Sequence, residues 1–361
     1  MKSKTLNSLI INGVLAIICL CWTVPTFGLL VSSFRDRLDI NKTGWWTIFP
    51  HKDWVSTEKI KPGPEVDRTL PMTFHGVTAT FEEFSKGIES EGLRLKWIGN
   101  RRVGYLDVQE YTWTASTIFT VENYKQVIAS KDYTAKLADG STVTERGDNM
   151  GNAFLNSLAV AVPSTIIPIT IAAFAAYGFA WMKFPGRKML FALVVTLLVI
   201  PLQIALVPIL RDYVKLGVNG TFLAVWLAHT GFGLPLATYL LFNYMSELPR
   251  DIMEAAFVDG ASHFTIFSKL VIPLSVPALA SFAIFQFLWV WNDYLVALIF
   301  IGASPTNQLV TQRLAEIVGS RGQDWHLLTA GAFITMLLPL AVFFGLQRFF
   351  VRGLLAGSVK G

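Results

Sequence analysis

Six uncharged stretches set the architecture of this 361-residue chain. They cover residues 5–34, 149–182, 189–210, 216–246, 270–292 and 325–347. About 20 mostly apolar residues cross roughly 30 Å of bilayer hydrocarbon, so each stretch holds one span and none comfortably holds two. Backbone polar groups in lipid must be satisfied within their own segment, so every span is expected to be a helix. The sequence therefore predicts an all-α polytopic membrane protein with spans near 10–31, 154–178, 189–210, 222–243, 279–301 and 327–349.

The amino-acid composition argues against several classes of function. Charged residues make up 15% of the chain, against about 25% in an average soluble domain. The net charge of +5 forms no dense run of Lys and Arg, which argues against nucleic acid as a partner. Cys19 and Cys21 face apart on a helix, and no His-Glu-x-x-His motif is present. We therefore expect no disulfide, no metal site and no catalytic residues.

Basic residues in the short loops predict the orientation. With the amino terminus inside, the inner segments carry ten Lys and Arg and the short outer loops carry four. Both termini are therefore expected in the cytoplasm. The first stretch exceeds a signal-peptide core of about 7–15 residues and lacks a clear cleavage site, so we interpret it as a retained span.

The segment 35–152 then lies outside the membrane. It holds more than half of the chain's charged residues and is long enough for a small domain. Stretches 73–81 and 93–105 are rich in β-branched and aromatic residues, which indicates short strands, and a helix is expected to start near Thr120. The predicted organisation is residues 1–34 as tail and first span, 35–152 as an extracytoplasmic α/β insertion, and 153–361 as the membrane core. A contact role for the insertion is preferred over a stabilising decoration.

The inner loop at 244–277 joins the fourth and fifth spans. Ser246 is a candidate helix cap, Pro249 suits a first helical turn, and Gly260 suits a carboxyl-terminal stop. Ser262 is placed to cap a second helix that runs into the membrane. The loop is therefore predicted to be a short helix, a turn and a second helix.

The first of these helices has the composition of a docking surface. Ala255 and Ala256 allow another backbone to approach closely, while Met253 and Phe257 are apolar groups with no large core to bury them. Glu254 and Asp259 lie five residues apart and so face different ways, which does not suit acid–base catalysis by a carboxylate pair. On these residues alone, an amphipathic connector lying on the membrane surface is an equal alternative.

The same loop resembles the cytoplasmic signature of permease subunits of binding-protein-dependent ABC importers. That signature is Glu-Ala-Ala, three residues, Gly, nine residues, then Ile-x-Leu-Pro. Here it reads 254–256, Gly260 and 270–273, with Leu270 and Ile272 in place of the usual Ile and Leu. Further matches to the carbohydrate members lie at 156–158, 184–187, 291–293 and in the tail 353–361. The segments 220–300 and 319–361 are most similar to α-glucoside permeases of the maltose-type second permease family.

The resemblance implies six transmembrane helices of the type I ABC importer permease fold in a bacterial inner membrane. It also implies that Glu254, Ala255, Ala256, Phe257, Asp259 and Gly260 couple to an ATPase. The chain has no Gly-Lys pair and hence no phosphate-binding loop, so ATP and Mg are expected on partner subunits and no cofactor on this chain. The implied partners are a second homologous permease, two ATP-binding subunits and a periplasmic sugar-binding protein.

The substrate implied is an α-linked di- or oligosaccharide. A polyol or glycerol phosphate is the alternative within transport, and a membrane enzyme or scaffold is the alternative outside it.

Asp293 is the acidic residue of the predicted fifth span, where a charge must face protein or water. Trp289 and Asn292 lie beside it, and aromatic faces with polar neighbours can hold a sugar ring. Gln203, between two prolines, is a further candidate for the pathway. The alternative, which we prefer, is that Asp293 pairs with a neighbouring helix and that these residues serve packing.

Overall fold

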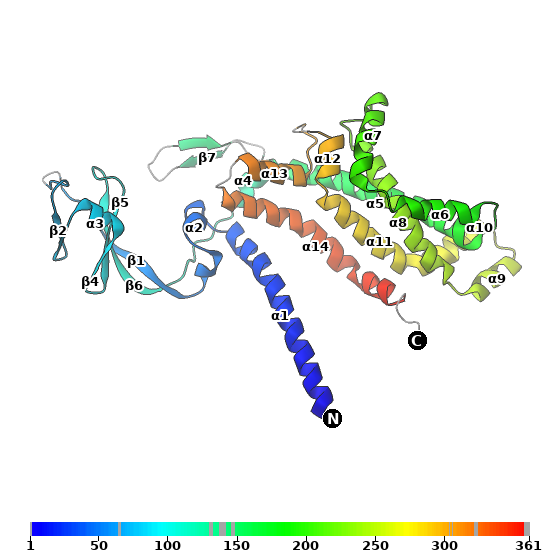
Figure 1. Ribbon diagram of the computed structural model, residues 1–361, viewed down its shortest axis with the longest axis horizontal. Helices are drawn as coiled ribbons and strands as arrows, with labels where there is room; N and C mark the ends of the chain where they lie inside the picture. Colours follow the sequence, from blue (N-terminus) through cyan, green and yellow to red (C-terminus); the bar gives the residue numbers. More distant parts are fainter. Residues whose placement is uncertain are drawn as a thin grey trace. The chain divides into compact units, whose positions relative to one another are not determined.

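The computed structural model describes residues 2–63, 66–129, 133–136, 142–145, 149–302, 304, 306–320 and 324–356, so the end of the predicted tail motif lies outside the described residues. The chain forms two compact units, which are drawn in Figure 1. The first comprises residues 1–31 and 38–120, and the second comprises residues 32–37 and 121–361. The second unit thus begins before the end of the predicted insertion at 152.

The first unit combines a long apolar helix with a small sheet domain. The helix α1 (Lys2–Ser33) is apolar and largely exposed from Leu9 to Trp22, as suits a helix surrounded by lipid. The short helical elements that follow are α2 (Arg37–Lys42) and η1 (Trp45–Ile48). The strands and the remaining helix are β1 (His51–Ile60), β2 (Met72–Phe74), β3 (Val77–Ala79), α3 (Phe81–Lys86), β4 (Ile88–Ser90), β5 (Leu93–Ile98) and β6 (Tyr105–Thr114).

The predicted strands are present, and four of them form one antiparallel sheet in the order β1-β6-β5-β4. The hairpin β2–β3 turns at His75 and Gly76, both with positive φ. A hydrophobic cluster packs against one face of the sheet. The cluster consists of Met72, Ala79, Phe84, Leu95, Trp97, Leu106 and Val108.

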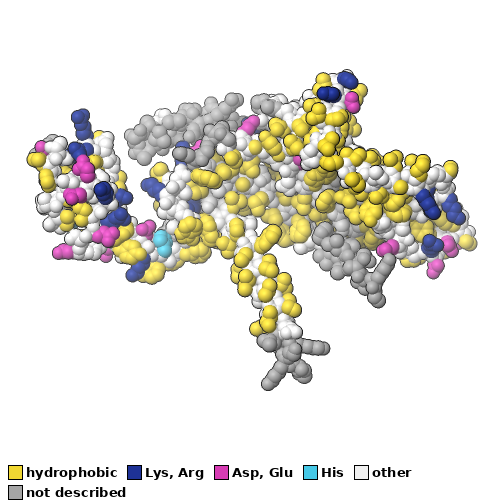
Figure 2. Space-filling model, viewed as in Figure 1, with side chains coloured by type: hydrophobic (Ala, Val, Ile, Leu, Met, Phe, Trp, Pro, Cys, Tyr) yellow, Lys and Arg dark blue, Asp and Glu magenta, His cyan; other side chains and the backbone are white. Residues whose placement is uncertain are grey.

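In the residues that the structure describes, the regular secondary structure of the second unit is helical except for one hairpin. Its helices are α4 (Glu122–Ile128), α5 (Met150–Trp181), α6 (Arg187–Leu197), α7 (Leu202–Lys215), α8 (Phe222–Ser246), α9 (Arg250–Val258), α10 (His263–Ile266), α11 (Ile272–Asn292), α12 (Leu295–Phe300), α13 (Val310–Ser320) and α14 (Trp325–Ala356). A π-helical turn, η2 (Phe267–Val271), joins α10 to α11, and the hairpin is β7 (Tyr133–Lys136) with β8 (Thr142–Glu145). Figure 2 shows hydrophobic side chains over most of these helices.

Residues 32–37 belong to this unit because they bind α4. The Asn123 amide donates hydrogen bonds to the carbonyl oxygens of Ser33 (2.9 Å) and Arg35 (2.8 Å). Ser33 Oγ and the Tyr124 hydroxyl oxygen lie 2.6 Å apart. The helix α4 starts after Val121 rather than at a Thr120 cap.

Close packing of small residues holds the centre of the second unit together. Ala172 and Ala176 of α5 and Ala237 of α8 are completely buried. Small side chains let helix backbones approach closely, which is a main source of association between helices in lipid.

The predicted third span is not one straight helix. Its two parts, α6 and α7, are bent by 100° across residues 198–201. Pro201 has extended backbone geometry at the amino end of α7, and the missing N–H of a proline interrupts helical hydrogen bonding. In the described residues, five helices are long and apolar enough to cross a membrane, or six if the bent pair is one span.

The predicted fifth span, 279–301, is placed too far along the chain. The continuous apolar helix runs over His263–Asn292 and includes the π turn. Asp293 follows it with extended ψ of 125°, and the separate helix α12 comes after. Pro273 lies in the first turn of α11, where its missing N–H is tolerated, so it does not end the helix.

Candidate functional site

The short helix α9 and its flanking turns form the first candidate site. Pro249 occupies the amino-terminal cap position of α9, whereas the predicted cap, Ser246, is the last residue of α8. Gly260 has φ of +78°, the left-handed geometry that ends many helices. Ser262 Oγ accepts a hydrogen bond from Thr265 N–H at 3.2 Å and so caps α10, as predicted. The helix-turn-helix form of this loop is therefore confirmed.

Met253 anchors α9 to the membrane helices. Its side chain is 1% exposed and packs with Met245 of α8 and Ile266 of α10. The expectation that Met253 lacks a core is therefore wrong. The local pattern of α9 does not reveal this burial, because the same cluster includes residues of α5, such as Ala176 and Tyr177.

The outer face of α9 is exposed and partly apolar. Glu254, Ala255 and the turn residues Asp259 and Gly260 face outward, whereas Ala256 is half-buried. Three apolar side chains are also exposed, at 44%, 38% and 86%: Ile252, Phe257 and Val258. Ile252 and Val258 were not predicted, although their spacing around Glu254 and Ala255 places them at the rim of the same surface. We call the exposed residues Ile252, Glu254, Ala255, Phe257, Val258, Asp259 and Gly260 the α9 surface.

His263 connects the α9 surface to the span α5. The Phe257 ring packs edge-on against the His263 ring, with centroids 5.0 Å apart. His263 Nδ1 lies 2.9 Å from the Tyr177 hydroxyl oxygen of α5. Tyr177 in turn packs against Phe267 of the π turn. Phe257 is thus connected through His263 and Tyr177 to the last turns of α5 and to the π turn that precedes α11.

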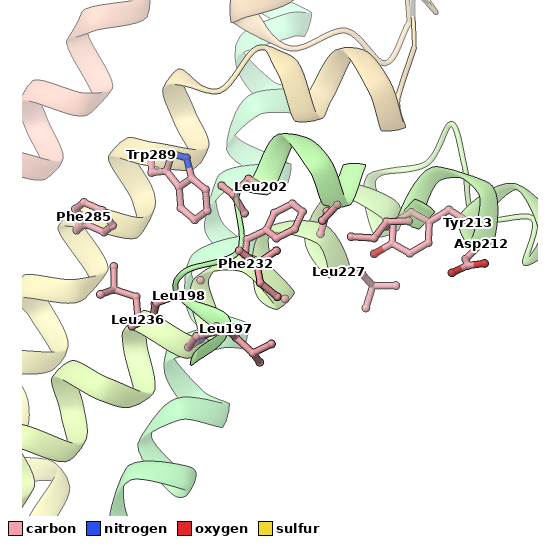
Figure 3. A pocket seen from close by; sticks show the side chains of 17 residues that line it. Leu197, Leu198, Leu202, Asp212, Tyr213, Leu227, Phe232, Leu236, Phe285 and Trp289 are labelled. Carbon is pink, nitrogen blue, oxygen red and sulfur yellow. The ribbon is translucent and has the colours of Figure 1, made fainter. Parts of the chain in front are cut away.

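The second candidate site is a pocket of about 560 Å³ beside the break between α6 and α7. Figure 3 shows Trp289 near Leu202 and Phe232, while Asp212 and Tyr213 stand at the opposite end. Gly231 and Gly233 of α8 also line it. The bend of the third span, which the sequence did not predict, contributes much of this lining.

Only one of the four predicted pathway residues lines this pocket. Trp289 does, whereas Gln203 is exposed on α7 outside the lining. The Asn292 amide donates to the Leu288 carbonyl of its own helix at 2.8 Å. Asp293 lies just beyond α11 and is also outside the lining.

Asp293 instead pairs with His229 of α8, at 3.4 Å between Oδ2 and Nε2. Its Oδ2 also accepts a hydrogen bond from Val296 N–H at 3.0 Å, which satisfies the amino end of α12. The His229 ring packs edge-on against Trp289, with centroids 5.3 Å apart. The pair thus fixes α8, Trp289 and the start of α12 relative to one another.

Beside this pair, Gln286 joins three helices. Its Nε2 donates to the carbonyl oxygens of Ser164 of α5 (3.1 Å) and His229 of α8 (3.3 Å). A Cβ added at Gly233 would come within 2.6 Å of Gln286 Oε1, so this glycine leaves room for the amide. In the described parts of the chain, no three His, Cys, Asp or Glu side chains gather as metal ligands.

Comparison with known protein families and sequences gives clear matches. Residues 168–355 match the model of the "binding-protein-dependent transport system inner membrane component" family. An osmoprotective compounds uptake permease protein of Synechocystis is 48% identical, over 99% of this chain and 94% of the relative. An α-glucoside transport system permease protein of Rhizobium meliloti is 46% identical, over 96% of this chain and 95% of the relative.

A solved structure shares the fold. A chain of a bacterial ABC transporter involved in the import of alginate aligns over 97% of this chain and 98% of its own, with a TM-score of 0.60. The two sequences are only 14% identical.

Proposed function

This chain belongs to the family of binding-protein-dependent transport system inner membrane components. We propose that it forms one half of a transmembrane pathway for a sugar, and that partner subunits change its conformation by moving α9. It is a permease subunit of an ABC importer in the membrane, a transporter component rather than an enzyme. The observation that carries the proposal is the α9 surface: exposed apolar side chains on a short helix that buried Met253 anchors to the membrane helices. Such a helix both binds a partner and transmits its motion.

The α9 surface binds an ATPase subunit. Ala255 allows close approach, Phe257 and Val258 supply apolar contact area, and Glu254 supplies a charge. ATP and Mg belong to two such subunits. When they close, α9 moves as a rigid body and shifts the equilibrium between inward-facing and outward-facing states.

The topology has six spans, with α6 and α7 together as the third. Both termini and α9 lie in the cytoplasm, and the sheet-bearing part of the first unit lies outside. Two observations support this arrangement: the excess of Lys and Arg in the predicted inner loops, and the charge-rich sheet between the first two spans. A second, homologous permease completes the pathway, and a periplasmic binding protein delivers the substrate.

The substrate is an α-glucoside or a related di- or oligosaccharide. The relative from Rhizobium meliloti supports this class, and the relative from Synechocystis favours osmoprotective compounds as the second candidate. Trp289 in the pocket offers an aromatic face for a sugar ring, with Tyr213 and Asp212 as polar groups at the far end.

ATP-driven uptake tests the proposal. The full complex in proteoliposomes, with binding protein outside and ATP inside, should accumulate labelled maltose or sucrose in preference to a polyol. Glu254→Lys should abolish this uptake while the amount of inserted protein stays normal. Glu110→Lys, the same charge reversal at an exposed residue of β6, is the matched control and should transport normally. Normal uptake by the Glu254 variant would remove α9 from the mechanism.

A further inference from the structure

The four-stranded sheet of the first unit has a second face with a distinct composition. The strand register sends Leu95, Leu106 and Val108 to the core, and the alternate side chains of the same strands to the opposite face. That opposite face carries both aromatic and basic side chains. We call it the open sheet face; it consists of Lys52, Trp54, Ser56, Lys59, Glu89, Arg94, Lys96, Ile98, Tyr105, Asp107, Gln109, Tyr111 and Trp113.

Cation–π contacts organise this face. Lys52 Nζ lies 5.9 Å from the centre of the Trp113 ring, and Lys59 Nζ lies 5.7 Å from that of Tyr105. Arg94 Cζ reaches across β6 to within 5.9 Å of the centre of the Trp54 ring. These contacts hold cations and rings in place before any partner binds, which lowers the entropy lost on binding.

The charge of the open sheet face is positive. Four cations, Lys52, Lys59, Arg94 and Lys96, stand against two carboxylates. The Asp107 carboxylate is 6% exposed and accepts hydrogen bonds from Ser56 Oγ and Gln109 Nε2, so it is not free to offset an exposed cation. Glu89, on the edge strand, is the other carboxylate.

The composition suits a protein partner better than a neutral sugar. Trp, Tyr and Arg are the residues enriched at protein interface hot spots, and Trp113 and Tyr111 are 66% and 52% exposed. A neutral sugar does not require four cations. A lipid surface is the alternative, and the test below separates it by its dependence on anionic lipid.

We propose that the open sheet face is the docking surface for an acidic patch on the periplasmic binding protein. This inference rests on the proposed function, because it names the surface that this partner uses. The four strands of this face have 10, 10, 6 and 3 residues. At about 3.3 Å per residue and about 4.8 Å between strands they present roughly 450 Å², at the low end for protein interfaces. A small, charged contact binds and releases quickly, as a delivery protein must do in each transport cycle.

The test measures stimulation of ATP hydrolysis by increasing concentrations of binding protein, using the full complex in liposomes. The Lys52→Glu/Lys59→Glu variant reverses two cations of the open sheet face. We expect its half-maximal concentration to rise about tenfold with the maximal rate unchanged, because rim charges act mainly on association. The control is Lys86→Glu/Arg102→Glu, which makes the same charge change on α3 and the β5–β6 turn. Trp113→Ala, which changes no charge, should also raise the half-maximal concentration.

Several results would overturn the docking surface. One is the same half-maximal concentration in wild type and in both open-sheet-face variants. Another is an effect of charge reversal seen only in liposomes that contain phosphatidylglycerol, which would assign the face to the membrane. A wild-type complex that no concentration of binding protein stimulates would instead refute the proposed function, and the docking surface with it.

Discussion

Asp293, which directly follows α11, contacts the buried His229 of α8, with 3.4 Å between Oδ2 and Nε2. His229 is 1% exposed, and its ring also packs against Trp289 at the pocket. The carboxylate also accepts a hydrogen bond from Val296 N–H in the first turn of α12. These contacts favour the packing interpretation of Asp293 over direct contact with the substrate.

Asp293→Ala should lower stability by about 1–3 kcal/mol, because it leaves His229 and the start of α12 without their acceptor. The apparent melting temperature of the purified complex measures this loss. Asp293→Asn should restore part of it, since an amide oxygen still accepts from Val296. Asn292→Ala is the control, because that amide binds only its own helix. A changed sugar preference at unchanged stability would instead place Asp293 in the pathway.

Gly260→Ala should impair uptake. A residue with a side chain loses about 1–2 kcal/mol when it adopts the φ of +78° found at Gly260. The turn after α9 should therefore shift, even though no atom lies within 4 Å of the added Cβ. Gly217, with φ of +68° and equally open surroundings, follows α7 and provides a matched control. We expect uptake per inserted molecule to fall only in the Gly260 variant. Equal losses would mean that the turn geometry of α9 has no special role.

Substitutions at Met253 and Val258 should distinguish the anchoring of α9 from its docking to a partner. Met253→Ala empties a buried site and should destabilise the protein by about 2–5 kcal/mol. Val258→Ala removes methyl groups that are 86% exposed and should leave the melting temperature unchanged while weakening binding of the ATPase subunits. Co-purification of the ATPase measures that binding. A Val258 variant with full ATPase binding would contradict its place on the α9 surface.

Gly233→Ala should destabilise the contact between α8 and α11 by about 1–3 kcal/mol, because the new methyl group displaces the Gln286 amide from its two carbonyl acceptors. Gly231→Ala, two residues earlier in the same helix, meets no atom within 4 Å and should be neutral or slightly stabilising. Thermal unfolding of the two variants under identical conditions provides the comparison.

Acid should loosen α3. The Thr80 backbone N–H and hydroxyl donate to Glu83 and hold the pKa of its carboxyl below the ordinary 4.5. A lowered folded-state pKa gives stability that is present above the unfolded value and is lost as pH falls through the folded value. Hydrogen-exchange protection of the Glu83 amide should therefore decrease at acidic pH. Glu83→Gln keeps a capping side chain without a titrating group, so its protection should not depend on pH in this range.

Local signals predicted much of the architecture. Charge-free stretches predicted a mostly helical membrane chain, which is confirmed, and the caps at Gly260 and Ser262 predicted the turns around α9. The bend at Pro201 and the early start of the fifth long helix were not predicted. Pro201 interrupts helical hydrogen bonding between α6 and α7, whereas Pro273 is tolerated in the first turn of α11. The sequence alone does not distinguish these two contexts.

The contacts that shape the candidate sites were beyond local reasoning. His229 meets Asp293, and Tyr177 meets His263, across separations that no periodicity reveals. The pocket beside Trp289 depends on the same missed bend in the third span. The roles of the predicted coupling residues remain predictions for the uptake measurements.

The π turn over Phe267–Val271 determines which way the side chains of α11 point around the helix axis. Each residue advances an α-helix by about 100°, so deleting one residue there would swing Trp289 a quarter-turn or more around its axis. The number of residues in the turn therefore fixes the rotation of Trp289 relative to the loop 244–277, whichever side chains occupy the turn.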